Sequence, residues 1–486
     1  MGARALFRCD ASSNIGAGHV MRCLAFAEEL TWAGWSCAFA TNRASAATVP
    51  ALAASGYEID EIEADDAPLS LDAETKLVVV DHYRLDSTFE RQLAAAGRTI
   101  VLFDDLADRP HACDILVDPT PGRCPDDYAL YVPAPARLQL GPNNAVIRCG
   151  WRAERARVRG RLAAGPPVER IIVSMGATDP LDATSRVLAG LARSGLDVHL
   201  DVVLGAGAPH LVRVAERVRP GITLHVDPAQ LPEIAAQADL AIGASGTSSF
   251  ERAVLGLPAI LIPIADNQRF IAAAFAAAGA AEVVSSALLD DPASLGARIA
   301  LLAADAPRRA AMSKAAASFT DGRGAPRLLA AIAGEVATGS GAHVRLRLVE
   351  PEDEGWLLEL QRQAATRRFA RNPAVPTAQE HAAWFARMLD NYDRFLAIVE
   401  ADHRAAGMVR LDKVSNRPVT LDISVAIDGR LHGKGLGGAA LTLARRLAPG
   451  ADLVAAVLPD NRASLALFAA AGYRPDGRDR YRNRAA

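Results

Sequence analysis

The chain has 486 residues, 50% of them hydrophobic, and a formal net charge of −3 at pH 7. This length favours two or three domains over a single core. The small net charge gives no global argument for nucleic acid or an anionic membrane surface as a partner. All six cysteines lie between Cys9 and Cys149 without a C-x-x-C pair, which favours free thiols over disulfides or a zinc site.

The first apolar segment begins at Ala5, which leaves no room for a signal peptide. No uninterrupted apolar stretch is long enough to cross a membrane, and residues 271–281 predict a core helix instead. We therefore expect a cytoplasmic protein.

The first part of the chain alternates apolar runs with helical stretches. The run containing Phe7 ends at Asp10, residues 77–80 end at Asp81, and residues 100–103 end at Asp104. Largely apolar strands that each end in a polar residue predict a parallel sheet covered on both faces. Functional groups of such sheets collect at the carboxyl ends of the strands.

The second part repeats this pattern, with apolar runs at residues 171–173, 198–204, 240–242 and 259–262. The arginine-rich residues 152–161 favour a solvated helix over a phosphate site, and the connection they belong to ends near Pro166 and Pro167. Residues 338–341 predict a flexible hinge before a third part. We expect an α/β protein with domains at residues 1–160, 161–337 and 343–486.

The segment 7–23 runs from a strand through Gly16 and Gly18 into a helix, with His19 near the start of that helix. The two glycines alone are equally consistent with a tight turn. Helix N–H groups disfavour imidazolium, so a histidine there stays neutral and can accept a proton. These residues leave a catalytic and a structural role for His19 both open.

Several segments in order closely resemble the UDP-sugar hydrolases of pseudaminic acid biosynthesis: residues 7–23, 81–83, 103–105 and 111–116. The resemblance implies two doubly wound, glycosyltransferase-B-like domains that release UDP from UDP-2,4-diacetamido-2,4,6-trideoxy-β-L-altropyranose. It makes His19 the base that activates water, and Tyr83 a residue that holds the sugar or orients the water. Asp10 and Asp81 either position substrate or cap helices.

Residues 243–251 follow an apolar run, and the small side chains of Ser245, Gly246 and Thr247 would let a helix N-terminus approach a diphosphate. Glu251, one turn into that helix, would accept from ribose hydroxyls. A capped surface helix is the alternative.

The stretch 243–268 resembles the UDP-binding half of glycosyltransferase-B proteins, including the UDP-N-acetylglucosamine transferase of peptidoglycan synthesis. This implies that Asn267 and Gln268 contact the sugar or phosphate and that Gly176 and Asp179 face the same cleft. No cluster of acidic residues suggests a metal, so we expect none; helix dipoles and backbone N–H groups would stabilise the leaving diphosphate.

Arg430-Leu431-His432-Gly433-Lys434-Gly435, between an apolar run and a helix, exposes backbone N–H groups that suit a diphosphate. This loop and residues 461–473 resemble the GNAT superfamily of N-acetyltransferases, a C-terminal α+β domain. The resemblance implies acetyl-CoA as cosubstrate, bound through Arg430, Gly433, Gly435, Gly437 and Asn461.

Phe468 stands where many family members have a tyrosine that protonates the leaving thiolate. Tyr473, Tyr481 or water could replace it, and an inactive domain is the third alternative. Glu350, Asp422 and Ser424 are candidate bases. Trp384 and Phe385 are expected in the core, and His381 on the surface.

Together these features predict a bifunctional enzyme of pseudaminic (nonulosonic) acid biosynthesis. The C-terminal domain would N-acetylate a UDP-4-amino-4,6-dideoxy sugar, and the first two domains would hydrolyse the product. The alternatives are a UDP-sugar glycosyltransferase fused to an acetyltransferase, and a non-catalytic sensor of nucleotide sugars or acetyl-CoA.

Overall fold

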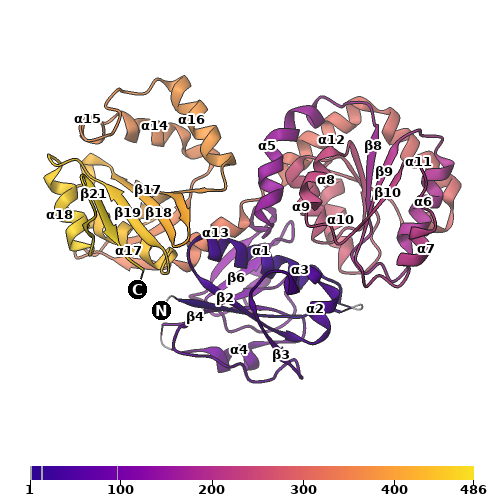
Figure 1. The fold of residues 1–486 in the computed structure, drawn as a ribbon, viewed down its shortest axis with the longest axis horizontal. Helices are drawn as coiled ribbons and strands as arrows, with labels where there is room; N and C mark the ends of the chain where they lie inside the picture. Colours follow the sequence, from indigo (N-terminus) through magenta and orange to yellow (C-terminus); the bar gives the residue numbers. More distant parts are fainter. Residues whose placement is uncertain (1–2, 13–14, 96, 486) are drawn as a thin grey trace. The chain divides into compact units, whose positions relative to one another are not determined.

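The computed structural model describes residues 3–12, 15–95 and 97–485. Ser13 and Asn14, in the glycine-containing loop before His19, lie outside the described residues. The chain divides into two compact units, one made mainly of Pro326–Ala486 with the segment Glu29–Ser36, the other of Leu6–Glu28 and Cys37–Ala325. Each unit is described separately below (Figure 1).

The first sheet has seven strands in the order β3-β2-β1-β4-β5-β6-β7. The pairs β2–β3, β4–β5, β5–β6 and β6–β7 are parallel. The strands are β1 (Arg4–Cys9), β2 (Ser36–Asn42), β3 (Glu58–Ile62), β4 (Thr75–Asp81), β5 (Thr99–Phe103), β6 (Ile115–Asp118) and β7 (Arg137–Leu140). The intervening helices are α1 (Gly18–Trp32), α2 (Ala44–Thr48), α3 (Pro50–Ala53) and α4 (Ser87–Leu93), with 3-10 turns η1 (Pro125–Tyr128) and η2 (Pro142–Asn144).

The second sheet is parallel, in the order β10-β9-β8-β11-β12-β13. Its strands are β8 (Arg170–Ser174), β9 (His199–Leu204), β10 (Ile222–Val226), β11 (Leu240–Gly243), β12 (Ala259–Leu261) and β13 (Glu282–Val283). Its helices are α5 (Cys149–Ala163), α6 (Ala183–Arg193), α7 (Leu211–Ala215), α8 (Leu231–Gln237), α9 (Ser248–Leu255), α10 (Gln268–Ala277), η3 (Ser286–Asp290), α11 (Pro292–Ala304) and α12 (Ala306–Phe319). The next helix, α13 (Gly324–Ile332), lies mostly in the other unit.

Helices cover both faces of this second sheet (Figure 1). One buried apolar cluster joins it to α5, α8, α9 and α10, and a second joins it to α6, α7 and α11. The apolar strand runs expected from the sequence lie in β4, β5, β8, β9, β11 and β12, which confirms two doubly wound α/β domains. In each sheet the strand order reverses beside the first strand, between β1 and β4 and between β8 and β11. Ligands of open α/β sheets bind outside the carboxyl ends of the strands at such a reversal.

The third sheet is mixed, with eight strands in the order β14-β15-β16-β17-β18-β19-β21-β20. Its strands are β14 (Glu335–Ala337), β15 (His343–Leu348), β16 (Arg394–Ala401), β17 (Arg404–Asn416), β18 (Val419–Ile427), β19 (Asp452–Ala456), β20 (Arg474–Pro475) and β21 (Arg480–Asn483). The helices are η4 (Pro351–Asp353), α14 (Glu354–Arg362), α15 (Ala364–Arg367), α16 (Ala378–Asp390), η5 (Gly429–Leu431), α17 (Leu436–Leu447) and α18 (Arg462–Ala470). Helices α14 and α16 pack on one face, and α17 lies on the other (Figure 1).

Three local expectations were wrong. Residues 338–341 are a hairpin turn, not a flexible hinge: β14 pairs with β15, and the Gly341 N–H donates to the Thr338 carbonyl oxygen at 2.9 Å. Helix α10 ends at Ala277 and buries only Ala272 and Phe275, so it is a surface helix rather than a core helix.

The arginine-rich α5 is also not a solvated helix. Arg155 donates to the carbonyl oxygens of Val254, Ala317 and Thr320, which lie at or near the C-terminal ends of α9 and α12. Arg161 donates to carbonyl oxygens at the end of α8. These arginines therefore satisfy acceptors that helix ends leave unpaired.

Among the described residues, no helix combines the length and the apolar character that crossing a membrane requires.

Candidate functional site

The carboxyl ends of β1, β4 and β5 are neighbours in the first sheet, and the loops that follow them carry the candidate catalytic residues. His19 is the second residue of α1, after β1, as the sequence predicted. Tyr83 follows β4, and Asp105 follows β5. His19 and Tyr83 are in edge-to-face contact, with ring centroids 4.4 Å apart.

Asp81, the last residue of β4, holds His19 in one tautomer. Its Oδ1 lies 2.5 Å from His19 Nδ1, and His19 is 6% exposed while Asp81 is fully buried. A carboxylate needs a donor, so Nδ1 carries the proton and the lone pair is on Nε2. The neutral ring can accept a proton only at Nε2.

Arg22, one turn after His19 on α1, binds both oxygens of the Asp81 carboxylate. Its Nη2 donates to Asp81 Oδ1 at 2.6 Å, and its Nε donates to Asp81 Oδ2. Burial alone would raise the pKa of Asp81, but the charges of Arg22 and His19 outweigh it and hold the pKa below its ordinary value. Asp81 therefore stays ionised beside His19 through the neutral pH range.

Arg22 also reaches Asp105, whose Oδ2 lies 3.4 Å from Arg22 Nη1 and 3.4 Å from the Tyr83 hydroxyl. Burial, with the negative charge of Asp105, raises the pKa of Tyr83, so the phenol stays protonated. Asn267 Nδ2 lies 3.5 Å from the Tyr83 hydroxyl oxygen. The structure thus brings Asn267 and Tyr83, both predicted site residues, together.

Asp10 is part of a different buried group. It pairs with Arg8 at 2.8 Å, lies 3.2 Å from His82 Nε2, and accepts from the Asn42 N–H at 2.7 Å. Burial would raise the pKa of Asp10, but the hydrogen bonds of His82 and Arg8 outweigh it and lower the pKa. These contacts join Asp10, which directly follows β1, to the end of β2 and to the loop after β4.

Asp10, Asp65 and His82 present ligand atoms within 4.8 Å of one another, the geometry that a metal ion would need. Arg8 and Arg84 already pair with the two carboxylates. Two guanidinium groups at the same carboxylates disfavour a further cation.

The nucleotide-binding segment predicted in the second sheet follows β11. Ser245 is buried and donates to the Gln268 carbonyl oxygen at 3.3 Å, a Cβ added to Gly246 would lie 4.0 Å from Gln268 Nε2, and Thr247 directly precedes α9. Glu251 lies in the first turn of α9. Burial raises the pKa of Glu251 to about 6, with Arg252, Arg148 and Trp151 opposing the shift.

Of the remaining residues predicted to bind the nucleotide, some have an accessible backbone and others are engaged in contacts within the protein. Gly16 and Gly176 have φ of +85° and +108° and open space around them, which leaves their backbone accessible. Asp179 instead caps α6, accepting from the N–H groups of Ala183 and Thr184 at 2.9 and 2.8 Å. Gln268 uses its Oε1 to accept from the Ile264 N–H at 3.0 Å. Gly18 lies where an added Cβ would be 3.3 Å from the Thr247 hydroxyl.

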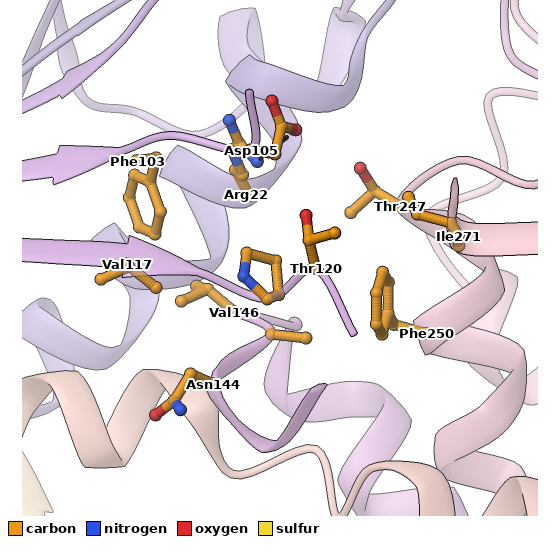
Figure 2. Close-up of a pocket in the computed structure, with 12 residues that line it drawn as sticks. Arg22, Phe103, Asp105, Val117, Thr120, Asn144, Val146, Thr247, Phe250 and Ile271 are labelled. Carbon is orange, nitrogen blue, oxygen red and sulfur yellow. Dashed lines mark hydrogen bonds and ion pairs between the residues drawn. The ribbon is translucent and has the colours of Figure 1, made fainter. Parts of the chain in front are cut away.

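A pocket within the unit of Leu6–Glu28 and Cys37–Ala325 is lined by residues from the ends of β5 and β6 and from α9 and α10. Figure 2 shows Arg22 and Asp105 beside each other on its wall, with Thr247 and Phe250 also lining it. The apolar lining residues are Phe103, Val117, Pro119, Ala145, Val146, Phe250 and Ile271.

The glycine-rich loop of the third sheet has the geometry of an anion site. Gly433 and Gly435 have φ of +81° and +79°, and Gly435 directly precedes α17. Glycines with positive φ in such a loop turn backbone N–H groups outward at the positive end of a helix. Arg430 is 81% exposed at the side chain and pairs with Asp428, whose pKa its hydrogen bond lowers.

The other residues predicted around acetyl-CoA also have local partners. A Cβ added to Gly437 would lie 3.1 Å from Leu467, so α17 and α18 approach closely there. Asn461 caps α18 by accepting from the Ser464 N–H at 3.1 Å. Glu350 is held by Arg327 in two hydrogen bonds of 2.9 and 2.8 Å.

Phe468 is buried against Tyr473, with ring centroids 4.9 Å apart. The Tyr473 hydroxyl is buried without a hydrogen-bond partner among the described residues, and it interacts electrostatically with Arg445 in the last turn of α17.

His381 is 3% exposed and packs against Trp384 and Phe385, so its expected surface position was wrong. Phe385 is buried and Trp384 packs on the same core, as predicted.

Two family descriptions match the sequence: "Acetyltransferase (GNAT) domain" over residues 343–474 and "Glycosyltransferase family 28 C-terminal domain" over residues 226–327. The chain combines a glycosyltransferase-B-like region with a GNAT domain. These matches confirm the glycosyltransferase-B-like and GNAT resemblances and the α/β fold class.

The UDP-2,4-diacetamido-2,4,6-trideoxy-beta-L-altropyranose hydrolase of Campylobacter jejuni is 24% identical over 238 residues, 46% of this chain and 78% of that protein. The spore coat polysaccharide biosynthesis protein SpsG of Bacillus subtilis is 25% identical over 205 residues, 41% of this chain. The chain spans only 59% of the length of SpsG. MurG of Acinetobacter baumannii aligns with 67% of this chain and 98% of its own, at 16% identity and a TM-score of 0.45.

Sequence reasoning missed Arg22 and Asp105. A signal for Arg22 was present, because residues three apart on a helix share a face and Arg22 is three residues after His19. Asp105 follows a strand end, the same signal that drew attention to Asp10, Asp81 and Asp104.

Proposed function

We propose that the chain is a bifunctional nucleotide-sugar enzyme that N-acetylates a UDP-4-amino-4,6-dideoxy sugar and then releases UDP from the product. The observation that carries the hydrolytic half is the contact between His19 Nδ1 and buried Asp81, which leaves Nε2 as the basic nitrogen. Similarity to the C. jejuni hydrolase supplies the substrate, UDP-2,4-diacetamido-2,4,6-trideoxy-β-L-altropyranose.

In the hydrolytic step, His19 Nε2 takes a proton from water as the water oxygen attacks the anomeric carbon. The bond from that carbon to the diphosphate oxygen breaks, and UDP leaves with the bonding electrons. Asp81 stabilises the imidazolium that forms, as a buried carboxylate behind a histidine does in other enzymes. Tyr83, held by Asp105, holds the sugar or orients the water.

The departing UDP is bound by the second sheet's domain. Backbone N–H groups around Gly246 and Thr247, at the start of α9, stabilise the diphosphate without a metal. Ionised Glu251 accepts from ribose hydroxyls. Asp10 keeps the loop before His19 in place, and Asn267 contacts the sugar side of the nucleotide.

The GNAT domain supplies the acetyl group. Backbone N–H groups of the loop at Gly433 and Gly435 hold the diphosphate of acetyl-CoA at the start of α17. The neutral 4-amino nitrogen attacks the thioester carbonyl carbon, the carbon–sulfur bond breaks, and coenzyme A leaves as thiolate. Because Phe468 has no proton to give, the proton that the nitrogen loses on forming the amide reaches the thiolate through water.

The deciding experiment incubates the protein with UDP-4-amino-4,6-dideoxy-N-acetylaltrosamine, with and without acetyl-CoA, and follows products by mass spectrometry. Free UDP that forms only with acetyl-CoA supports both steps in sequence. If the sugar is acetylated but UDP stays attached, the hydrolytic assignment is wrong. Supplying the ready-made diacetamido sugar separates a wrong sugar from an inactive acetyltransferase.

A UDP-sugar glycosyltransferase is the second candidate, because residues 226–327 match a glycosyltransferase family description. That function requires transfer of the sugar to an acceptor other than water. UDP release that accelerates with an added acceptor and yields no free sugar would favour it.

A further inference from the structure

Asp105 has a carboxylate oxygen that the protein itself does not use. Its Oδ2 receives the Tyr83 hydroxyl and Arg22 Nη1. Its Oδ1 is buried and has no hydrogen-bond partner among the described residues. A charged acceptor that is desolvated without a donor costs folding free energy, and such a group in a native structure needs an explanation.

Arg22 does not supply the missing donor in this structure. Its Nε and Nη2 donate to Asp81, and its Nη1 is directed to Oδ2 of Asp105. Arg22 therefore pairs with Oδ2 of Asp105 and leaves Oδ1 to a donor from a ligand.

The position of Asp105 in the sheet indicates which part of a sugar it would meet. His19, Tyr83 and Asp105 follow β1, β4 and β5, which are consecutive in the sheet. Neighbouring strands lie about 4.8 Å apart, so Asp105 is about 10 Å along this edge from the loop with His19. A sugar whose anomeric carbon is at His19 would extend its opposite end, the C3 and C4 substituents, toward Asp105.

The surroundings of Asp105 suit a group that has one N–H donor and an apolar remainder. Phe103, Val117 and Val146 line the pocket beside it (Figure 2). An acetamido group fits this chemistry, because its N–H can donate to Oδ1 while its methyl group contacts the apolar wall.

We propose that Asp105 is a specificity-determining residue that accepts a hydrogen bond from the N–H of the sugar's 4-acetamido group. This proposal rests on the proposed hydrolytic function. The hydrolytic site therefore recognises the nitrogen that the GNAT domain acetylates. The competing explanation is that Asp105 acts only by positioning Tyr83, because Asp105 also accepts from the Tyr83 hydroxyl.

The test compares two UDP-sugars, the 2,4-diacetamido substrate and its 4-deoxy analogue, which has no donor at C4. Asp105→Ala is expected to lower kcat/KM at least about tenfold for the first and less than about threefold for the second, as loss of one hydrogen bond to a charged acceptor predicts. Asp105→Asn, which keeps an amide oxygen, should recover part of the loss. Asp108→Ala, an exposed change in the same loop, is the matched control.

Equal losses on both substrates, reproduced by Tyr83→Phe, would overturn the inference, since Asp105 would then act only by placing Tyr83. A thermal unfolding midpoint for Asp105→Ala equal to that of Asp108→Ala shows that folding is intact. If the wild-type protein releases no UDP from the diacetamido sugar, the proposed function is wrong and the inference falls with it. If the wild type is active and its preference for the acetamido substrate survives in Asp105→Ala, only the inference is wrong.

Discussion

At the scale of single residues, the proposed hydrolytic chemistry depends on one histidine whose ring is oriented by a buried carboxylate. Asp81 fixes the proton on His19 Nδ1, and Arg22 fixes Asp81. The strand end that carries Asp81 was visible in the sequence, but its contact with His19 joins residues 62 positions apart. Such a contact depends on the sheet order, which periodicity alone does not determine.

His19→Ala is expected to lower UDP release by a factor of about 10²–10⁴, the usual contribution of a general base. Acetyl transfer should be unchanged, because the GNAT domain has its own site. The measurement is the initial rate of UDP formation from the diacetamido sugar, alongside acetylation of the amino sugar. His210→Ala, a change in the loop before α7, is the control, and a His19→Ala protein with normal UDP release would show that His19 is not the base.

Glu251 should make nucleotide binding depend on pH. Its pKa of about 6 means that the carboxylate is ionised at neutral pH and becomes protonated as the pH falls through 6. The protonated form loses an acceptor for ribose hydroxyls, so the Kd for UDP should rise below about pH 6 and level off above about pH 7. Isothermal titration calorimetry across this pH range measures the Kd for UDP.

Glu251→Gln should bind UDP more weakly at neutral pH and lose the step near pH 6, whereas exposed Glu233→Gln in α8 should keep it. A step that persists in Glu251→Gln would assign the titration to another group.

At the scale of elements, the glycine-rich loop before α17 depends on backbone conformations that only glycine adopts freely. Gly435→Ala places a side chain at φ +79°, which costs about 1–2 kcal/mol and crowds the anion site. We expect the Kd for coenzyme A to rise at least about tenfold, measured by calorimetry. Gly438→Ala, in the same helix with open space around it, should leave binding unchanged.

Helix α5 shows how an arginine-rich sequence can act inside a fold. Arg155→Met removes donors from three carbonyl oxygens near the ends of α9 and α12. Because the group is only partly buried, we expect a loss of about 2–3 kcal/mol in the free energy of unfolding. Denaturant midpoints measure this, and exposed Arg159→Met on the same helix should change the midpoint little.

These elements also mark what the sequence could predict. The strands β4 and β5 were predictable because each is an apolar run with a polar end, and β8 and β11 because each contains a short apolar run. The arginines of α5 were not, because their acceptors belong to other helices. The turn at residues 338–341 has the composition of a linker, and only the pairing of β14 with β15 makes it a hairpin. His381 was misplaced because its burial depends on how α16 packs.

At the scale of the whole molecule, the two proposed activities would belong to sites that can be disabled separately. His19→Ala removes only the base for hydrolysis, and Gly435→Ala weakens only the site for acetyl-CoA. With the amino sugar and acetyl-CoA, the first variant should accumulate the acetylated UDP-sugar. The second should leave the amino sugar unchanged yet hydrolyse ready-made diacetamido sugar at the wild-type rate.

Mixing the two variants should restore UDP release, because the acetylated UDP-sugar is a soluble anion that can leave one chain and bind another. The measurement is the time course of free UDP, with a lag that shortens as the concentration of the Gly435→Ala chain increases. Such a lag follows from an intermediate that must accumulate in solution before the second step can proceed. If each variant retains its own single step but the mixture releases no UDP, the intermediate does not leave the chain. The two domains would then have to act on one bound substrate.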